Sequence, residues 1–176
     1  MPPLNHAVLS ASSAYRWLEC PPSALATADI PDETTIYAQE GSAAHEMAEY
    51  KIRWHLGAKD LAPPNVGNFN AEEIDRYTDS YAYYATDKIE TIRKICPDAI
   101  VMVEQRLDFS NYVKDGFGTG DLVIVADDVL QVIDFKYGKG VTVSAELNPQ
   151  MMLYALGALN LYGYLYDIKT VKTAIV

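Results

Sequence analysis

The chain of 176 residues has few cysteines and few positive charges. Its two cysteines, Cys20 and Cys96, are too few for a disulfide scaffold and fit a reducing compartment. Fourteen Lys and Arg residues stand against 24 Asp and Glu residues, which gives a net charge of −10. This acidic excess argues against a protein that coats nucleic acid with a basic surface. An enzyme that approaches nucleic acid through a local basic groove or through metal ions stays open.

Long apolar runs are missing as well. No run approaches the roughly 20 residues that span a bilayer. The N-terminus lacks a basic stretch followed by an apolar one, so we expect no secretory signal, no membrane partner and a cytoplasmic protein. Apolar residues make up 49% of the chain and charged residues 22%, a balance typical of a folded domain with a real core.

Helical patterns fill the first half of the chain. Serines within residues 10–13 offer helix starts, and Pro21-Pro22 breaks that run. A helix is predicted over residues 40–56, with Gly57 as its stop.

The clearest helix follows Asn70, a good N-cap residue with Glu73 three positions later, and Pro97 closes it. The 13 tyrosines of the chain suit base stacking, but those in this helix sit at core spacing and are not counted as nucleic-acid contacts. They belong to one apolar stripe, which comprises Ile74, Tyr77, Tyr81, Tyr84, Ile89, Ile92 and Ile95.

Strand patterns follow. Residues 99–109 are rich in β-branched side chains, and two apolar runs flanking residues 127–128 predict a hairpin. A mostly apolar helix opens at residues 148–149, and residues 171–176 predict a last strand. The order helix, helix, strand, strand, strand, helix, strand indicates a mixed α/β (α+β) fold, with a small mixed sheet flanked by helices.

We expect one domain over residues 1–176, with an N-terminal helical segment over 1–39 and a core over 40–176. The chain stops inside its last predicted strand, whereas termini normally lie beyond the last element. We therefore expect either the front part of a longer protein or a further element that covers this strand.

The predicted hairpin brings charged residues together. A two-residue loop at 127–128 places Asp121 directly opposite Asp134, with Lys136 on the same face. Facing carboxylates repel, and Cβ atoms about 4.5–5.5 Å apart would let both bind one divalent cation. Two interpretations stay open from spacing: such a cation site, or a solvated hairpin end with one salt bridge.

Four motifs extend this picture: "EGSAAHEMAE", "GTGD", "VIDFKYGKG" and "NPQMMLYALGAL" occur in this order. Together they resemble the PD-(D/E)XK nuclease superfamily, and within it the RecB-like exonuclease branch with its phage-type members. The resemblance covers the chain from about Glu40 to Val176. It implies a restriction-endonuclease-like core in the order αβββαβ, here with an extra helix before the first strand.

The resemblance also implies roles for individual residues. His45, Asp121 and Asp134 match the metal ligands of the family, with the backbone carbonyl of Phe135 as a further ligand. Lys136 matches the catalytic lysine. The implied cofactor is Mg²⁺ or Mn²⁺.

Gln150 and Tyr154 match a motif that supports the site and contacts nucleic acid, and a spacing of four puts both on one helix face. They also fit an ordinary amphipathic face. His45, taken alone, also fits a structural histidine. Glu104 interrupts an apolar strand and could approach the metals or contact substrate, but we expect it to be a strand-edge charge.

By this resemblance, the protein is expected to be a metal-dependent DNA exonuclease of phage recombination or repair, in a bacterial or phage-infected cytoplasm. DNA is the expected partner, joined by a recombination protein or further copies of the chain. The alternative is a weakly active or inactive DNA-binding recombination-accessory protein with the same fold. An enzyme acting on another phosphodiester is a third possibility.

The segment "RWLECPPS" resembles the N-terminal cysteine segment of iron–sulfur members of the family. A typical [4Fe–4S] cluster takes four thiolates, and Cys96 is the one other cysteine, at a position that does not match. Cys20 would therefore ligate a cluster if further C-terminal cysteines exist. Without them we expect an ordinary buried thiol.

Overall fold

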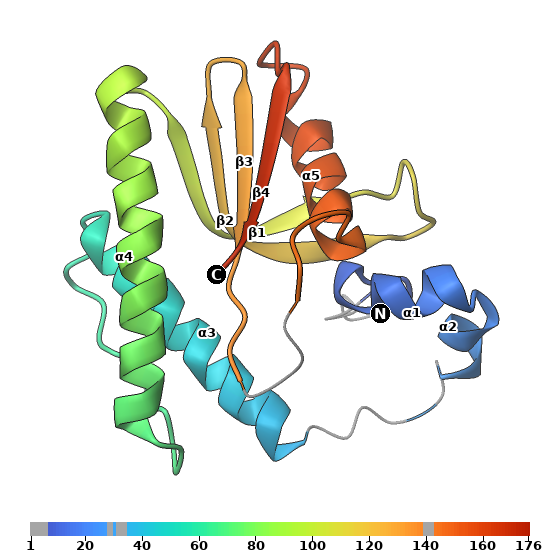
Figure 1. The fold of residues 1–176 in the computed structure, drawn as a ribbon, viewed down its shortest axis with the longest axis horizontal. Coiled ribbons are helices and arrows are strands. Elements are labelled where there is room, and N and C mark those ends of the chain that lie inside the picture. The colour runs from blue at the N-terminus through green and yellow to red at the C-terminus, as the bar shows by residue number, and fades with distance from the viewer. Residues whose placement is uncertain (1–6, 28–29, 31–34, 139–142) are drawn as a thin grey trace.

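The computed structural model describes residues 7–27, 30, 35–138 and 143–176 (Figure 1). Within these ranges the mixed α/β fold class expected from the sequence is confirmed. The elements are η1 Ala11–Ser13, α1 Ala14–Glu19, α2 Pro22–Ala26, α3 Ile36–His55, α4 Ala71–Ile95, β1 Ile100–Asp108, β2 Phe117–Ala126, β3 Val129–Asp134, α5 Pro149–Tyr162 and β4 Thr170–Ile175.

One four-stranded sheet, in the order β1-β2-β3-β4, forms the centre of the molecule. The pairs β1–β2 and β2–β3 are antiparallel, whereas β4 runs parallel to β3. A parallel pair needs a crossover connection, and α5 supplies it. The predicted core order αβββαβ, with an extra helix before the first strand, is confirmed.

Helices cover the two faces of this sheet (Figure 1). The α5 helix packs across one face and, with the short N-terminal helices, buries one set of alternating strand residues, which includes Val123, Val125, Leu130 and Val132. The α3 and α4 helices lie on the other face and bury the opposite set, which includes Leu122, Ile124, Ile133 and Phe135. Side chains alternate between faces along each strand, so the sheet has a separate core on either side.

The α4 helix begins as predicted, because the Asn70 side chain accepts a hydrogen bond from the Glu73 backbone N–H. Its predicted apolar stripe is partly wrong, since Tyr77 is 45% exposed and Ile95 is 81% exposed. The buried stripe follows spacings of three and four instead and comprises Ile74, Thr78, Tyr81, Ala85 and Ile89. Thr78 tolerates burial because its hydroxyl donates to the carbonyl of Ile74, at 2.7 Å.

The α3 helix starts at Ile36, four residues before the predicted start. The Thr35 side chain caps it by accepting a hydrogen bond from Ala38, and Gly57 follows its end with a φ of 112°, as a helix stop requires. Its buried face consists of Ala44, Ala48 and Ile52, so small side chains let the helix approach the sheet closely.

Near the N-terminus, the predicted break at Pro21-Pro22 is confirmed, because α1 ends before it and α2 starts at Pro22. The expectation of a buried Cys20 is wrong: Cys20 is exposed, whereas Cys96 is buried. The reason is that Cys20 lies at the exposed junction between two short helices. No helix among the described residues is both long enough and apolar enough to cross a membrane.

Candidate metal centre

The β2–β3 hairpin has the predicted register. Ala126 pairs with Val129 around the loop at residues 127–128, and the last ladder pair, Leu122–Ile133, leaves Asp121 beside Asp134. The two carboxylate residues are 8% and 2% exposed, respectively. The alternative of a solvated hairpin end is therefore wrong, and the sheet buries two acidic residues side by side.

A third carboxylate continues this row on β1. The ladder pairs on either side of Glu104 place it across from Asp121. Glu104 has a φ of 53°, a left-handed backbone conformation that costs about 1–3 kcal/mol for a residue with a side chain. Glu104 lies on β1, an edge strand of the sheet as expected, but it is half-buried next to Asp121. Glu104, Asp121 and Asp134 thus form a row across three neighbouring strands.

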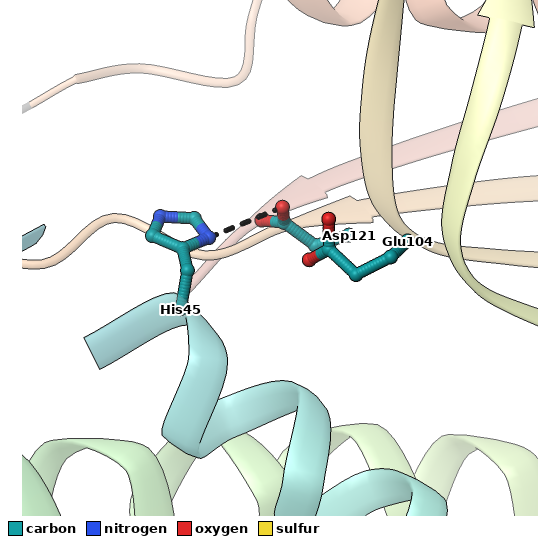
Figure 2. Close-up of side chains that lie close together, drawn as sticks. All are labelled: His45, Glu104 and Asp121. Atoms are coloured by element: carbon teal, nitrogen blue, oxygen red, sulfur yellow. Dashed lines mark ion pairs between the residues drawn. The ribbon is translucent and has the colours of Figure 1, made fainter. Parts of the chain in front are cut away.

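The α3 helix brings His45 to one end of this row. His45 Nδ1 lies 3.2 Å from Asp121 Oδ1, and Figure 2 shows the imidazole pointing toward the Asp121 and Glu104 carboxylates. The other Asp121 oxygen accepts a 2.6 Å hydrogen bond from the backbone N–H of Phe135. One ligand atom from each of His45, Glu104 and Asp121 lies within 4.8 Å of the other two, a group that excludes Asp134.

Crowding of like charges perturbs the ionisation of this cluster. Burial, the largest influence, lowers the pKa of His45, but the hydrogen bond and charge of Asp121 and the charges of Glu104 and Asp134 together raise it above 6.5. Burial, followed by the charges of Asp121 and Glu49, raises the pKa of Glu104 to about 7. Without a cation, protons on His45 and Glu104 relieve part of the repulsion.

At the other end of the row, the protein supplies its own cation. Lys136 Nζ lies 2.8 Å from Asp134 Oδ2 and donates a 3.0 Å hydrogen bond to Gln150 Oε1. The Gln150 amide donates to Asp134 Oδ1 at 3.3 Å and to the Tyr154 hydroxyl at 3.1 Å. Burial and the charge of Asp121 raise the pKa of Asp134, and Lys136 opposes this rise. The helix face predicted for Gln150 and Tyr154 therefore does contact this end of the row.

Close backbone packing holds Tyr154 in this network. A Cβ atom on Gly118 would lie 2.7 Å from Tyr154 Cε1, so the glycine of the "GTGD" motif leaves room for the tyrosine ring. Tyr154 is 5% exposed, and burial, foremost, raises its pKa so that the hydroxyl stays protonated. The packing of Tyr154 against Gly118 therefore helps to place Gln150, which donates a hydrogen bond to the Tyr154 hydroxyl.

Phe135 occupies the space between the helices and the carboxylate row. Its ring stacks on Tyr81 at a centroid distance of 4.7 Å and lies 5.3 Å from the His45 ring. Tyr81 is 1% exposed, and its hydroxyl has no hydrogen-bond partner among the described residues. A narrow crevice, too tight for a water molecule, is lined by Tyr81 together with His45, Glu104 and Asp121. The role of the Phe135 carbonyl as a ligand stays a prediction.

An open cleft of about 630 Å³ gives access to the whole row. All three carboxylates, His45, Lys136 and Gln150 line it. Its outer walls are rich in hydroxyl groups, which come from Ser10, Ser12, Ser42 and Thr119. A ligand in this cleft would meet Lys136 as well as the acidic groups.

The carboxylate oxygens of the cluster suit Mg²⁺ and Mn²⁺, whereas the imidazole is a donor that Zn²⁺, Cu²⁺, Fe²⁺ and Ni²⁺ also take. The structure brings every predicted site residue to one cleft wall or directly behind it. Sequence reasoning missed Glu104 and Tyr81 as members of the site. The interruption of an apolar strand was a usable signal for Glu104, whereas Tyr81 has the spacing of any core residue.

Comparison with known proteins adds a family assignment. No solved structure matches the chain. A family model described as "Protein of unknown function (DUF2800)" matches residues 6–176, which include every residue of the candidate centre. Because the match spans nearly the whole chain, the protein belongs to the DUF2800 family.

Proposed function

We propose that the protein is a metal-dependent deoxyribonuclease, an exonuclease that acts in phage recombination or repair in a bacterial or phage-infected cytoplasm. One observation carries this proposal: the buried pair Asp121 and Asp134 shares an open cleft with Lys136. Two carboxylates and an adjacent lysine are what phosphodiester hydrolysis with a divalent cation needs. The four motifs that resemble PD-(D/E)XK nucleases support the same reaction.

Mg²⁺ or Mn²⁺ would be held by His45, Asp121, Asp134 and the Phe135 carbonyl. When bound, such a cation polarises a phosphate oxygen and lowers the pKa of a coordinated water. The hydrogen bond from the Phe135 N–H fixes one oxygen of Asp121, so the other oxygen is left to face His45. A carboxylate held in this way needs little reorganisation to bind a cation.

Among the described residues that line the cleft, Lys136 is the one lysine or arginine, and its ammonium group faces Asp134 of the carboxylate row. Asp134 and Gln150 hold its ammonium group in place before any substrate arrives. A positioned donor of this kind stabilises negative charge as it develops on a phosphate oxygen, or orients the attacking water. Gln150 and Tyr154 are positioning residues in this scheme, because they act through Lys136 and Asp134.

The net charge of −10 bears on how DNA would reach the cleft. Neutralisation of phosphates by Lys and Arg dominates the affinity of most proteins for DNA. We therefore propose that a recombination partner protein or further copies of the chain contribute positive surface.

The test is hydrolysis of linear single-stranded and double-stranded DNA with Mg²⁺, with Mn²⁺ and with EDTA. Asp121→Ala and Lys136→Ala serve as site variants, and a non-DNA phosphodiester serves as a second substrate. Metal-dependent DNA degradation by the wild type that both variants lose is the expected result. Equal degradation by wild type and variants would show that the site is wrong. DNA binding without hydrolysis would favour the accessory-protein alternative, and hydrolysis of the other phosphodiester alone would favour a different enzyme.

A further inference from the structure

The carboxylate of Glu104 has no role in the function proposed above. We propose that Glu104 is a cation ligand that joins His45 and Asp121 at their end of the carboxylate row. This inference deepens the proposed function by naming an additional ligand. It concerns binding of the metal alone, so it is measured without DNA.

The geometry of these three residues matches what a small divalent cation requires. Their ligand atoms lie within 4.8 Å of one another. Ligands on opposite sides of a Mg²⁺ ion bonded at 2.0–2.1 Å are about 4.2 Å apart. Small side-chain rotations therefore suffice to close the three groups around one ion. Figure 2 shows the carboxylates and the imidazole converging from a strand pair and from α3.

Glu104 differs from Asp134 in having no partner in the protein. Its carboxylate makes no hydrogen bond or ion pair within the described ranges, whereas Asp134 contacts both Lys136 and Gln150. The cationic groups near Glu104 are already engaged. Arg53 donates to Glu49 and to a backbone carbonyl of β1, and Lys136 is held at the other end of the row. The negative charges of Asp121 and Glu49 outweigh the positive charges of His45 and Arg53 at Glu104, and a half-buried carboxylate in such surroundings is a favourable place for an external cation.

The Tyr81 hydroxyl points to the same conclusion independently. It is buried and unpartnered, and it lines the narrow crevice that His45, Glu104 and Asp121 also line. Buried hydroxyls are nearly always hydrogen-bonded, so an unpaired one signals a missing partner. A carboxylate that rotates to bind a cation would provide that partner.

The experiment is titration of metal-free protein with Mn²⁺, with free Mn²⁺ measured by electron paramagnetic resonance. Glu104→Gln removes the proposed ligand, and Glu46→Gln is the matched control because Glu46 lines the same cleft outside the cluster. We expect wild type and Glu46→Gln to bind Mn²⁺ alike, and Glu104→Gln to bind at least about tenfold more weakly. Circular dichroism of each variant verifies that it is folded. Equal affinities of Glu104→Gln and wild type would overturn the inference, as would a wild type that does not bind Mn²⁺.

DNA hydrolysis by the same samples separates this inference from the proposed function. If the wild type binds Mn²⁺ in a Glu104-dependent way but cuts no DNA, the metal site stands and the nuclease proposal fails. If the wild type cuts DNA and Glu104→Gln binds Mn²⁺ as tightly as it does, the nuclease proposal stands and the role of Glu104 fails.

Discussion

The two ends of the carboxylate row handle negative charge in opposite ways. On the Lys136 side, one ion pair and three hydrogen bonds link the residues, which are Asp134, Lys136, Gln150 and Tyr154. Two of these residues come from α5. On the His45 side, which comprises His45, Glu104 and Asp121, two carboxylates face one imidazole.

This difference indicates that the two ends of the row have different functions within one cleft. The Lys136 side is complete without any ligand, as a preorganised group for stabilising charge should be. The His45 side carries an excess of negative charge that a cation would balance. The four variants that follow alter one side while leaving the other in place.

Removing the built-in cation should have the largest effect. Lys136→Met keeps the length of the side chain but removes its charge, so we expect DNA hydrolysis to fall by about 10²–10³-fold. The initial rate on linear DNA with Mn²⁺ measures this. Mn²⁺ affinity should not fall, because every proposed ligand stays in place and Asp134 loses a competing cation. Lys169→Met on the exposed surface should change neither quantity. A matching loss of metal affinity would show that the two sides are not separate.

Filling the space beside Tyr154 should disturb the Lys136 side through shape alone. The added Cβ of Gly118→Ala would meet the Tyr154 ring at 2.7 Å, and we expect a loss of about 1–3 kcal/mol in the free energy of unfolding. Urea unfolding measures the change. Gly41→Ala is the control for an added methyl group that meets nothing within 4 Å, and on α3 it should gain about 1 kcal/mol. If Gly118→Ala is as stable as the wild type, Tyr154 is not held by this close approach.

Gln150→Ala tests the hydrogen bonds that orient Lys136. The ammonium group would keep its ion pair with Asp134 and lose its second anchor, so we expect hydrolysis about tenfold slower with little change in Mn²⁺ affinity. Single-turnover rates measure the effect. Met152→Ala, at an exposed position of the same helix, should leave the rate unchanged. An unaltered rate in Gln150→Ala would mean that Asp134 alone positions the lysine.

The smallest effect concerns stability on the His45 side. Glu104→Gln removes one of two crowded charges, so at about pH 8, above the raised pKa of Glu104 near 7, metal-free protein should gain about 1 kcal/mol and about 2–4 °C in Tm. The gain should begin to shrink as the pH falls below that pKa and should disappear near 4.5, the ordinary pKa, where the unfolded chain also binds the proton. Differential scanning calorimetry of metal-free wild type, Glu104→Gln and Glu46→Gln measures it. A Tm for Glu104→Gln below that of the wild type would show that the carboxylate is already compensated by the protein.

Local signals in the sequence were sufficient for much of the fold. The Asn70 cap, the Gly57 stop and the hairpin loop at residues 127–128 depend on neighbours in the chain, and each was confirmed. Once the loop was placed, the ladder put Asp121 next to Asp134 without further information. The helix spacing likewise put Gln150 and Tyr154 on one face.

The solvent exposure of individual side chains was harder to predict. Tyr77 and Thr78 are adjacent residues of one helix, and the polar one is buried because α4 is rotated by its packing against α3 and the sheet. Cys20 is exposed because two short helices meet there at the surface. Neither outcome follows from residue type or spacing.

The amino-acid order alone was enough to specify the αβββαβ core, the hairpin register and the side-by-side carboxylates, because capping, turn chemistry and alternation act over a few residues. The packing of the helices against the sheet decided which side chains contact those carboxylates. Asp121 lies next to Glu104, whose backbone is left-handed, and next to His45, which α3 brings to the sheet. Asp134 instead accepts a hydrogen bond from Gln150 of α5, which also binds Lys136. Contacts between segments far apart in the chain depend on how whole elements pack, and no short pattern records that.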